Sequence, residues 1–192
     1  MKDKIETQKD RMDRIIEWVK ACDTKTSIVM TIALLVPTFI MGNDWVLERL
    51  VRILTPVVEA IKNHGEGYCF SWQNFVVLFL FVLTLVFFSI CIIKFIRVLL
   101  AKTRENTYGN GVKNNSLIHF YYISTIKDFG TYKQLAECEK EDDYYEDLLS
   151  QTYINAKRCK EKFDDYNSGV RWLSGAIISL VLFIVTLFIV TA

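Results

Sequence analysis

The chain has 192 residues, of which 52% are hydrophobic and 23% are charged, and its formal net charge is +1. This near balance of charge excludes a generally basic surface, so no direct contact with nucleic acid is expected. The hydrophobic residues are gathered into long uncharged stretches, which predicts a membrane protein. We expect an all-α fold with three transmembrane helices, a cytoplasmic helical bundle continuous with the spans, and an outer amphipathic helix.

The N-terminal segment, residues 1–26, has apolar residues at close to seven-residue spacing among charged ones, which is typical of a helix with one apolar face. No signal peptide is visible, so we expect a cytoplasmic helix that leads into a first transmembrane helix at 27–42. This stretch has only 16 uncharged residues and reaches membrane length if Asp23 and Lys25 lie at the lipid headgroups. Within it, Pro37 removes one backbone donor, which predicts a kink or a hinge.

The segment at 43–72 is expected to form an outer loop that contains an amphipathic helix. Asn43 and Asp44 can cap this helix. Its apolar residues recur at steps of three and four: Leu47, Leu50, Val51, Leu54, Val57, Val58 and Ile61. The sequence leaves open whether this apolar face lies on the outer lipid leaflet or packs on the spans or a neighbouring subunit.

Two further spans follow at 73–93 and 172–192, and the positive charges predict the orientation of all three. Seven Lys and Arg residues precede the first span, three lie in the outer loop, thirteen lie within 94–171 and none follows the last span. Because cytoplasmic segments hold the excess of Lys and Arg, we expect a cytoplasmic N-terminus and a cytoplasmic helical region at 94–171.

The cytoplasmic region is expected to form two helical parts after an exposed loop at 106–116 that is rich in Asn and Gly. The first part runs from 117 to about 129, where Gly130 interrupts it, and the second runs as one helix from about 142 to 190. An apolar stripe continues along the second part into the membrane: Tyr145, Leu149, Thr152, Ala156, Cys159, Phe163, Tyr166, Val170, Leu173 and Ile177. Such a helix would couple a cytoplasmic event to its span, although the same pattern fits a helix that only completes a bundle.

Small residues lie where this last helix enters the membrane. Gly169 and Gly175 would let another helix approach closely, so we expect helix packing at this face. Self-association of the chain through the same face is a hypothesis.

No spacing in the sequence matches a catalytic motif, a phosphate-binding loop or a metal site, so we expect no enzyme, no metal and no cofactor. The five cysteines give no disulfide framework. An acidic run at 137–147 can bind a divalent cation, but a role at the start of the following helix is the favoured interpretation. Basic residues at 157–162 and rings at 119–122 can serve a small anionic ligand. The alternatives are positive charges beside a span for the former and core residues for the latter.

Three segments of the chain are similar to the transmembrane effectors of Pycsar, the bacterial pyrimidine cyclase system for anti-phage resistance. They are WVKACDTKTS at 18–27, NNSLIHFYYI at 114–123 followed by Tyr132, and YYEDLLSQTYINAKRCKEKF at 144–163. Together they extend the resemblance over nearly the whole chain. The long outer loop and the lack of an appended recognisable cyclic-nucleotide-binding domain depart from the family pattern.

The resemblance implies that a neighbouring nucleotide cyclase makes cyclic UMP or cyclic CMP on infection. An effector in the bacterial inner membrane then senses the nucleotide and oligomerises or opens, so that membrane integrity fails and abortive infection follows. Membrane lipid and further copies of the chain are the other partners that we expect.

Two groups of candidate site residues follow from the basic and aromatic clusters and from the matched positions. The candidate ligand-binding residues are Tyr121, Gln151, Asn155, Lys157, Arg158 and Lys160. The candidate membrane-boundary or gating residues are Asp23, Lys25 and Pro37. Asp23 and Lys25 can equally form an ion pair with a structural role.

The sequence leaves two other functions open. One is a membrane toxin that a retron or a cyclic-oligonucleotide defence system controls. The other is a non-toxic membrane scaffold that recruits a partner through its helices at 117–166.

Overall fold

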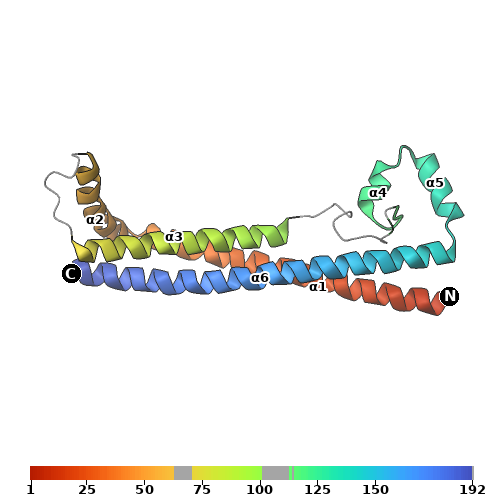
Figure 1. The fold of residues 1–192 in the computed structure, drawn as a ribbon, viewed down its shortest axis with the longest axis horizontal. Helices are drawn as coiled ribbons and strands as arrows, with labels where there is room; N and C mark the ends of the chain where they lie inside the picture. The colour runs from red at the N-terminus through yellow and green to blue at the C-terminus, as the bar shows by residue number, and fades with distance from the viewer. Residues whose placement is uncertain (63–70, 101–112, 114, 192) are drawn as a thin grey trace. The chain divides into compact units, whose positions relative to one another are not determined.

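The computed structural model describes residues 1–62, 71–100, 113 and 115–191. The helices in these ranges are α1 (Lys2–Met41), α2 (Asp44–Lys62), α3 (Trp72–Leu99), α4 (Phe120–Thr125), α5 (Phe129–Cys138) and α6 (Glu141–Thr191) (Figure 1). The same ranges contain no strand, and α1, α3 and α6 are each long and apolar enough to cross a membrane. The expected all-α membrane fold is therefore confirmed. Most of the loop predicted at 106–116 lies outside the described residues.

The chain divides into two compact units, which we name the head unit (Met1–Lys25 and Val98–Asp164) and the span unit (Thr26–Arg97 and Asp165–Ala192). Helices α1 and α6 contribute residues to both units. Helix α6 is a single helix of 51 residues, which confirms the prediction of one helix over this part of the chain. Its first turn contains three acidic residues, which the positive end of the helix dipole favours.

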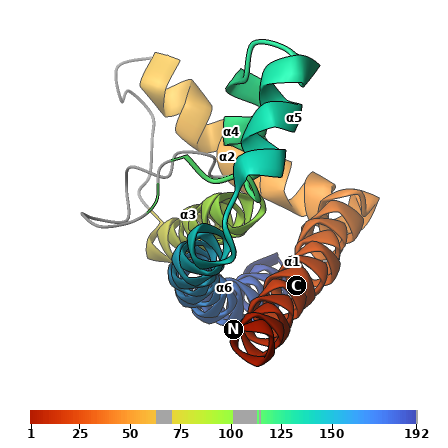
Figure 2. The same ribbon diagram turned by 90° about the vertical axis from the view of Figure 1, so that its right-hand side faces the viewer.

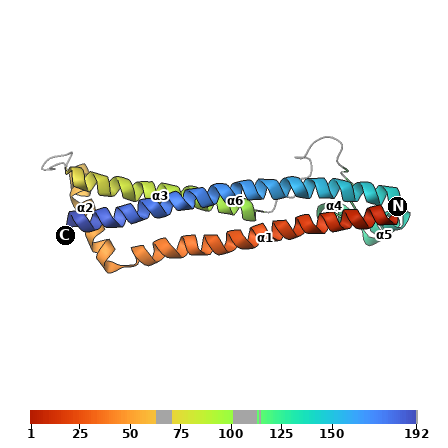
Figure 3. The same cartoon turned by 90° about the horizontal axis from the view of Figure 1, so that it is seen from below.

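In the span unit, α3 lies alongside the second part of α6 (Figures 1 and 3). Aromatic rings join the two helices at three levels: Phe81 with Phe183 at 5.4 Å, Phe87 with Trp172 at 5.4 Å, and Phe95 with Tyr166 at 6.2 Å between ring centroids. The hydroxyls of Thr84 and Ser179 hydrogen-bond at 3.0 Å, and Lys94 pairs with Asp165 at 2.8 Å. Lipid is as apolar as these rings, so close packing and polar contacts, rather than the hydrophobic effect, hold such helices together.

Two glycines of α6 make room for the rings of α3. A Cβ added at Gly169 would lie 2.6 Å from Phe95 Cε1, and one added at Gly175 would lie 3.3 Å from the ring of Phe87. The face for which the sequence suggests self-association is thus in contact with α3 within the chain.

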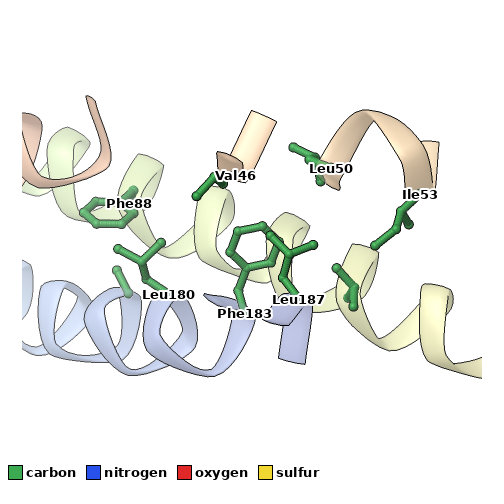
Figure 4. Packing of buried hydrophobic residues seen from close by; sticks show 9 residues of the cluster. Val46, Leu50, Ile53, Phe88, Leu180, Phe183 and Leu187 are labelled. Carbon is green, nitrogen blue, oxygen red and sulfur yellow. The ribbon is translucent and has the colours of Figure 1, made fainter. Parts of the chain in front are cut away.

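Helix α2 runs across α3 and α6 at the end where α3 begins and α6 finishes (Figures 1 and 3). Asn43 caps it, because its Oδ1 accepts a hydrogen bond from the Trp45 amide at 3.0 Å, as the sequence predicts. One row of its apolar side chains is buried in the core of the span unit: Val46, Leu50 and Ile53. Figure 4 shows this row next to Phe183 and Leu187 of α6. Part of the apolar face therefore packs on the spans, which is one of the alternatives that the sequence leaves open.

In the head unit, the first residues of α1 contact the first part of α6. Gln8 Nε2 donates to Thr152 Oγ1 at 2.8 Å, and the ammonium of Lys9 lies 5.3 Å from the centroid of the Tyr144 ring. Helix α1 continues from these contacts into its apolar part without a break, as the sequence predicts.

The buried positions on α6 differ from the predicted apolar stripe. Leu149 and Ala156 were expected in this stripe but are exposed. The buried residues in this part of the helix are Asp147, Leu148, Gln151, Ile154 and Cys159. The reason is that α6 is covered on two sides, by α1 at Thr152 and by the chain at Lys113, whose amide donates to Ser150. A single seven-residue pattern cannot describe two such faces.

The prediction of one helix at 117–129 is wrong, because the structure has two separate helices in and beyond this range. Helix α4 is much shorter than this range, and α5 starts at Phe129 and includes Gly130 (Figures 1 and 2). The cause is Asp128, whose backbone is extended and whose carboxylate caps α5 by accepting from the Thr131 amide at 2.9 Å. The hydrogen bonds from the amide and hydroxyl of Thr131 hold the pKa of Asp128 below its usual range.

Candidate functional site

A face of α6 in the head unit combines several polar side chains that are wholly or partly buried. They repeat at steps of four, four and three residues and therefore share one side of the helix: Asp147, Gln151, Asn155 and Arg158. We call this face the polar stripe. Asp147 and Gln151 are 0% and 2% exposed, and the other two are half-buried. The stripe offers a carboxylate, two amides and a guanidinium, which together can bind hydrogen-bond donors and a phosphate.

Asp147 is the member of the stripe that the sequence analysis missed as a site residue. Both of its carboxylate oxygens are buried, and neither has a hydrogen-bond partner among the residues that the structure describes. Such a group costs free energy of folding, because its lost hydration is not replaced. Natural proteins break this rule mainly at functional sites. The four-residue spacing between Asp147 and Gln151 is the signal in the sequence that could have found it.

The chain just before α4 lies against the same part of α6. The Lys113 amide donates to Ser150 Oγ at 3.2 Å, and the Lys113 ammonium donates to the carbonyl of Asp143 at 2.9 Å. Ser116 is fully buried, and its Oγ accepts from the His119 amide at 3.0 Å, which orders the chain just before α4. The segments at 114–123 and 144–163, which resemble the family, therefore lie close to each other in the head unit, and the segment at 18–27 meets 144–163 through Asp23 and Lys162.

The structure brings three of the six candidate ligand-binding residues together. Gln151, Asn155 and Arg158 belong to the polar stripe. Lys157 and Lys160 are exposed, and the 100° turn per residue puts Lys160 about 180° around the helix from Gln151. One small ligand cannot contact both the buried stripe and Lys160.

Tyr121, the sixth candidate, belongs to an exposed aromatic group. Tyr121 and Phe120 are 48% and 64% exposed, whereas His119 is buried. A hollow of about 240 Å³ lies nearby and is lined by Ile123, Ile126, Asp128, Phe129 and Tyr132. None of these lining residues is basic, and the one carboxylate caps α5, so the hollow is poorly suited to a phosphate.

The candidate boundary residues lie on α1. Asp23 pairs with Lys162 of α6 at 2.5 Å, and Lys25 is exposed. Lys25 is the partner that the sequence suggests, but side chains two residues apart do not face each other on a helix. Pro37 lies inside α1.

Glu139, between α5 and α6, is expected to make the stability of the head unit depend on pH. Burial raises the pKa of Glu139, Lys113 opposes this rise, and the nearby Asp147 and Asp143 reinforce it. The folded chain then binds the proton more tightly than the unfolded chain. Stability therefore falls as the pH rises from the ordinary pKa of glutamate through the raised one. We expect Glu139→Gln to remove this slope in thermal unfolding of the purified chain between about pH 4 and pH 7.

The control for this measurement is Glu137→Gln. Glu137 is 67% exposed in its side chain and should keep the slope of the wild type. A Glu139→Gln variant whose stability still depends on pH as the wild type does would contradict the assignment.

These features define the class of the protein. Three helices of membrane length and a helical head unit that carries the polar stripe describe an α-helical membrane protein. In the part of the chain that the structure describes, no group of three or more His, Cys, Asp or Glu side chains could hold a metal ion, and the four cysteines are free thiols.

Comparison with known proteins identifies the family. Residues 7–190 match the family model of the Pycsar effector protein domain, so the chain belongs to the Pycsar effector family. Pycsar effector protein GmPycTM from Gulbenkiania mobilis is 29% identical over 180 residues, which cover 91% of this chain and 86% of the relative. Pycsar effector protein EcPycTM from Escherichia coli is 26% identical over 145 residues, which cover 73% and 78%. No solved structure matches the chain.

The family assignment confirms the resemblance found in the sequence. It places the chain among the anti-phage defence effectors, in a system whose signal comes from a cyclase.

Proposed function

We propose that this chain is an effector of the bacterial inner membrane that cyclic UMP or cyclic CMP activates. The head unit lies in the cytoplasm, where a neighbouring nucleotide cyclase makes the signal on infection. The activated chain oligomerises or opens, the membrane is impaired, and abortive infection stops the phage. The chain does this without catalysis. The family assignment and the three membrane-length helices support the proposal.

The nucleotide binds at the polar stripe and displaces the packing that buries Asp147 and Gln151 in the structure. Asp147 and Gln151 offer acceptors to the N–H groups of a pyrimidine base, as carboxylates do to the amino group of cytosine elsewhere. Arg158 offers its guanidinium to the phosphate. Gln151 and Arg158 are about 10 Å apart along the helix at 1.5 Å per residue, which is close to the length of a nucleoside monophosphate.

The observation that carries this proposal is the continuity of α6. One helix from Glu141 to Thr191 contains both the polar stripe and a membrane span. A ligand shifts an equilibrium only when it binds one state more tightly than the other, and a tenfold preference corresponds to about 1.4 kcal/mol. A nucleotide that changes the packing of the stripe therefore also biases the span of the same helix.

Asp147→Asn is expected to stabilise the folded chain and to abolish its response to the nucleotide. The amide keeps the shape of the side chain and removes its charge, so the additional cost of burying a charge without a partner is relieved, while the cost of a buried polar group remains. The same change removes the carboxylate that accepts from the base. We expect a higher unfolding temperature in detergent, together with loss of membrane depolarisation in bacteria that co-express a pyrimidine cyclase.

Asp142→Asn is the matched control, because Asp142 is an exposed carboxylate in the first turn of the same helix. It should lower the stability only slightly, through the loss of one favourable charge at the start of the helix, and should leave depolarisation unchanged. A stabilised Asp147→Asn variant that still responds to the cyclase would contradict the role of Asp147. Depolarisation by the wild type without any cyclase would contradict control by a nucleotide.

A further inference from the structure

One side of α2 has apolar side chains that the described part of the chain leaves exposed. Besides the row packed on the spans, Leu47, Val51 and Val58 are 47%, 50% and 45% exposed, and we name these three the uncovered strip. At 100° per residue, the buried row and the uncovered strip are adjoining parts of one apolar arc. Charged residues occupy the remaining side of the helix, among them Glu48, Arg52 and Glu59. The core of the span unit thus covers only part of the apolar surface of α2.

Arg49 indicates the direction in which the uncovered strip points. Its guanidinium donates to the hydroxyl of Thr191, the last described residue of α6, and lies 4.3 Å from the centroid of the Trp45 ring. The Arg49 side of α2 therefore faces the end of the spans. The uncovered strip lies about 160–180° around the helix from Arg49 and so points toward the middle of the spans.

The depth of α2 follows from its contacts in the core. Its buried row shares this core with Val77, five residues after the first residue of α3, and with Leu187, four residues before the last residue of α6. At 1.5 Å per residue, Val77 and Leu187 lie about 6–8 Å inside the ends of the two helices, and Phe183, next to the row in Figure 4, lies about 12 Å inside the end of α6. A side chain at this depth that points toward the middle of the membrane is surrounded by acyl chains rather than water.

We propose that the uncovered strip is immersed in the acyl chains of the lipid leaflet at this end of the spans. Helix α2 then lies in the plane of the membrane, with the spans on one side of its apolar arc and lipid on the other. The charges support this partner, because Glu48, Arg52 and Glu59 lie outside the arc, about 60–100° around the helix from Arg49, where long side chains can reach the headgroups. Trp45 and Arg49, in contact with each other, are residues typical of the membrane interface.

Photo-crosslinking in a defined bilayer tests this assignment. The full chain is placed in nanodiscs of phosphatidylethanolamine and phosphatidylglycerol, with the photoreactive residue benzoylphenylalanine at either Val51 or Arg52. These neighbours are both exposed, so neither change disturbs the core, but they lie on different sides of α2. After illumination, mass spectrometry of the intact chain should show several-fold more lipid adduct at 51 than at 52.

Three outcomes would overturn the proposal. A crosslink between two copies of the chain at 51 would make a second copy the partner of the strip. Absence of any adduct at 51 would mean that the strip faces water. Equal lipid adducts at 51 and 52 would mean that the helix has no preferred side toward lipid.

Discussion

Replacing Gly169 with leucine is expected to disturb the packing of α3 on α6 and to destabilise the span unit. The first carbon of any side chain at this position would lie 2.6 Å from Phe95 Cε1. The Phe95 ring is fully buried, so it has no free space into which to turn. Extra carbon atoms in a close-packed contact lower the free energy of unfolding by about 1–3 kcal/mol. Leucine adds four side-chain carbon atoms that glycine lacks. The expected result is a midpoint of thermal aggregation in detergent that is lower by several degrees.

Alanine at each of the two glycines gives the matched control. In an unobstructed helix position, glycine to alanine stabilises by roughly 0.5–1 kcal/mol. Gly175→Ala should be close to neutral, because its Cβ would lie 3.3 Å from a Phe87 ring that is only half-buried. Gly169→Ala should already destabilise, and Phe95→Ala should partly restore the Gly169→Leu variant. Wild-type stability of Gly169→Leu would show that α3 and α6 do not pack in this way.

Asp164→Pro is expected to abolish membrane depolarisation by the chain, while each of the two units keeps its own fold. Asp164 is exposed and is the last residue that α6 contributes to the head unit. Proline removes the amide that bonds to the carbonyl four residues earlier and clashes with it, which costs about 3 kcal/mol or more in a helix. The polar stripe and the contact between α3 and α6 do not include this residue. Nucleotide binding should therefore persist in calorimetric titration, whereas depolarisation should be lost.

Asp164→Ala removes the same carboxylate without breaking the helix, so it should respond as the wild type does. A proline variant that binds nucleotide and still depolarises the membrane fully would contradict transmission along α6. A proline variant that binds no nucleotide would show that the head unit itself depends on the continuous helix.

The spans and the length of α6 could be predicted because both depend on local sequence. Long uncharged runs, and an apolar pattern that continues from 145 to 177 and so crosses from the charged part of the helix into its span, need no knowledge of distant contacts. Asn43 was predicted as a cap for the same reason, since a cap bonds within two or three residues of itself.

The contacts between distant segments could not be predicted in this way. Gln8 meets Thr152, and Asp23 meets Lys162, across 144 and 139 residues of sequence. No local pattern indicates that the start of α1 lies along the start of α6. The sequence therefore suggested Lys25 as the partner of Asp23 and placed Leu149 in an apolar stripe, although Leu149 is exposed.

The candidate site was predicted only in part. Gln151, Asn155 and Arg158 lie on one face because their spacing is helical, and this could be read from the sequence. Lys157 and Lys160 are candidates because of their charge and their place in a segment that resembles the family, and neither reason depends on the side of α6 on which they lie. Asp147 was overlooked because an acidic run at the start of a helix already has a sufficient explanation in the helix dipole. Its burial depends on tertiary packing, which the sequence does not reveal.

The most direct test of nucleotide control is a measurement of membrane potential with purified components. The chain is reconstituted in vesicles of phosphatidylethanolamine and phosphatidylglycerol with a potassium gradient and a voltage-sensitive dye, and nucleotide is supplied on both faces. We expect the potential to collapse on addition of cyclic UMP or cyclic CMP but not of cyclic AMP, and to persist in vesicles with the Asp147→Asn variant. Collapse of the potential before any nucleotide is added would contradict control of the chain by a nucleotide. A stable potential at saturating cyclic UMP and cyclic CMP would contradict activation by these two nucleotides.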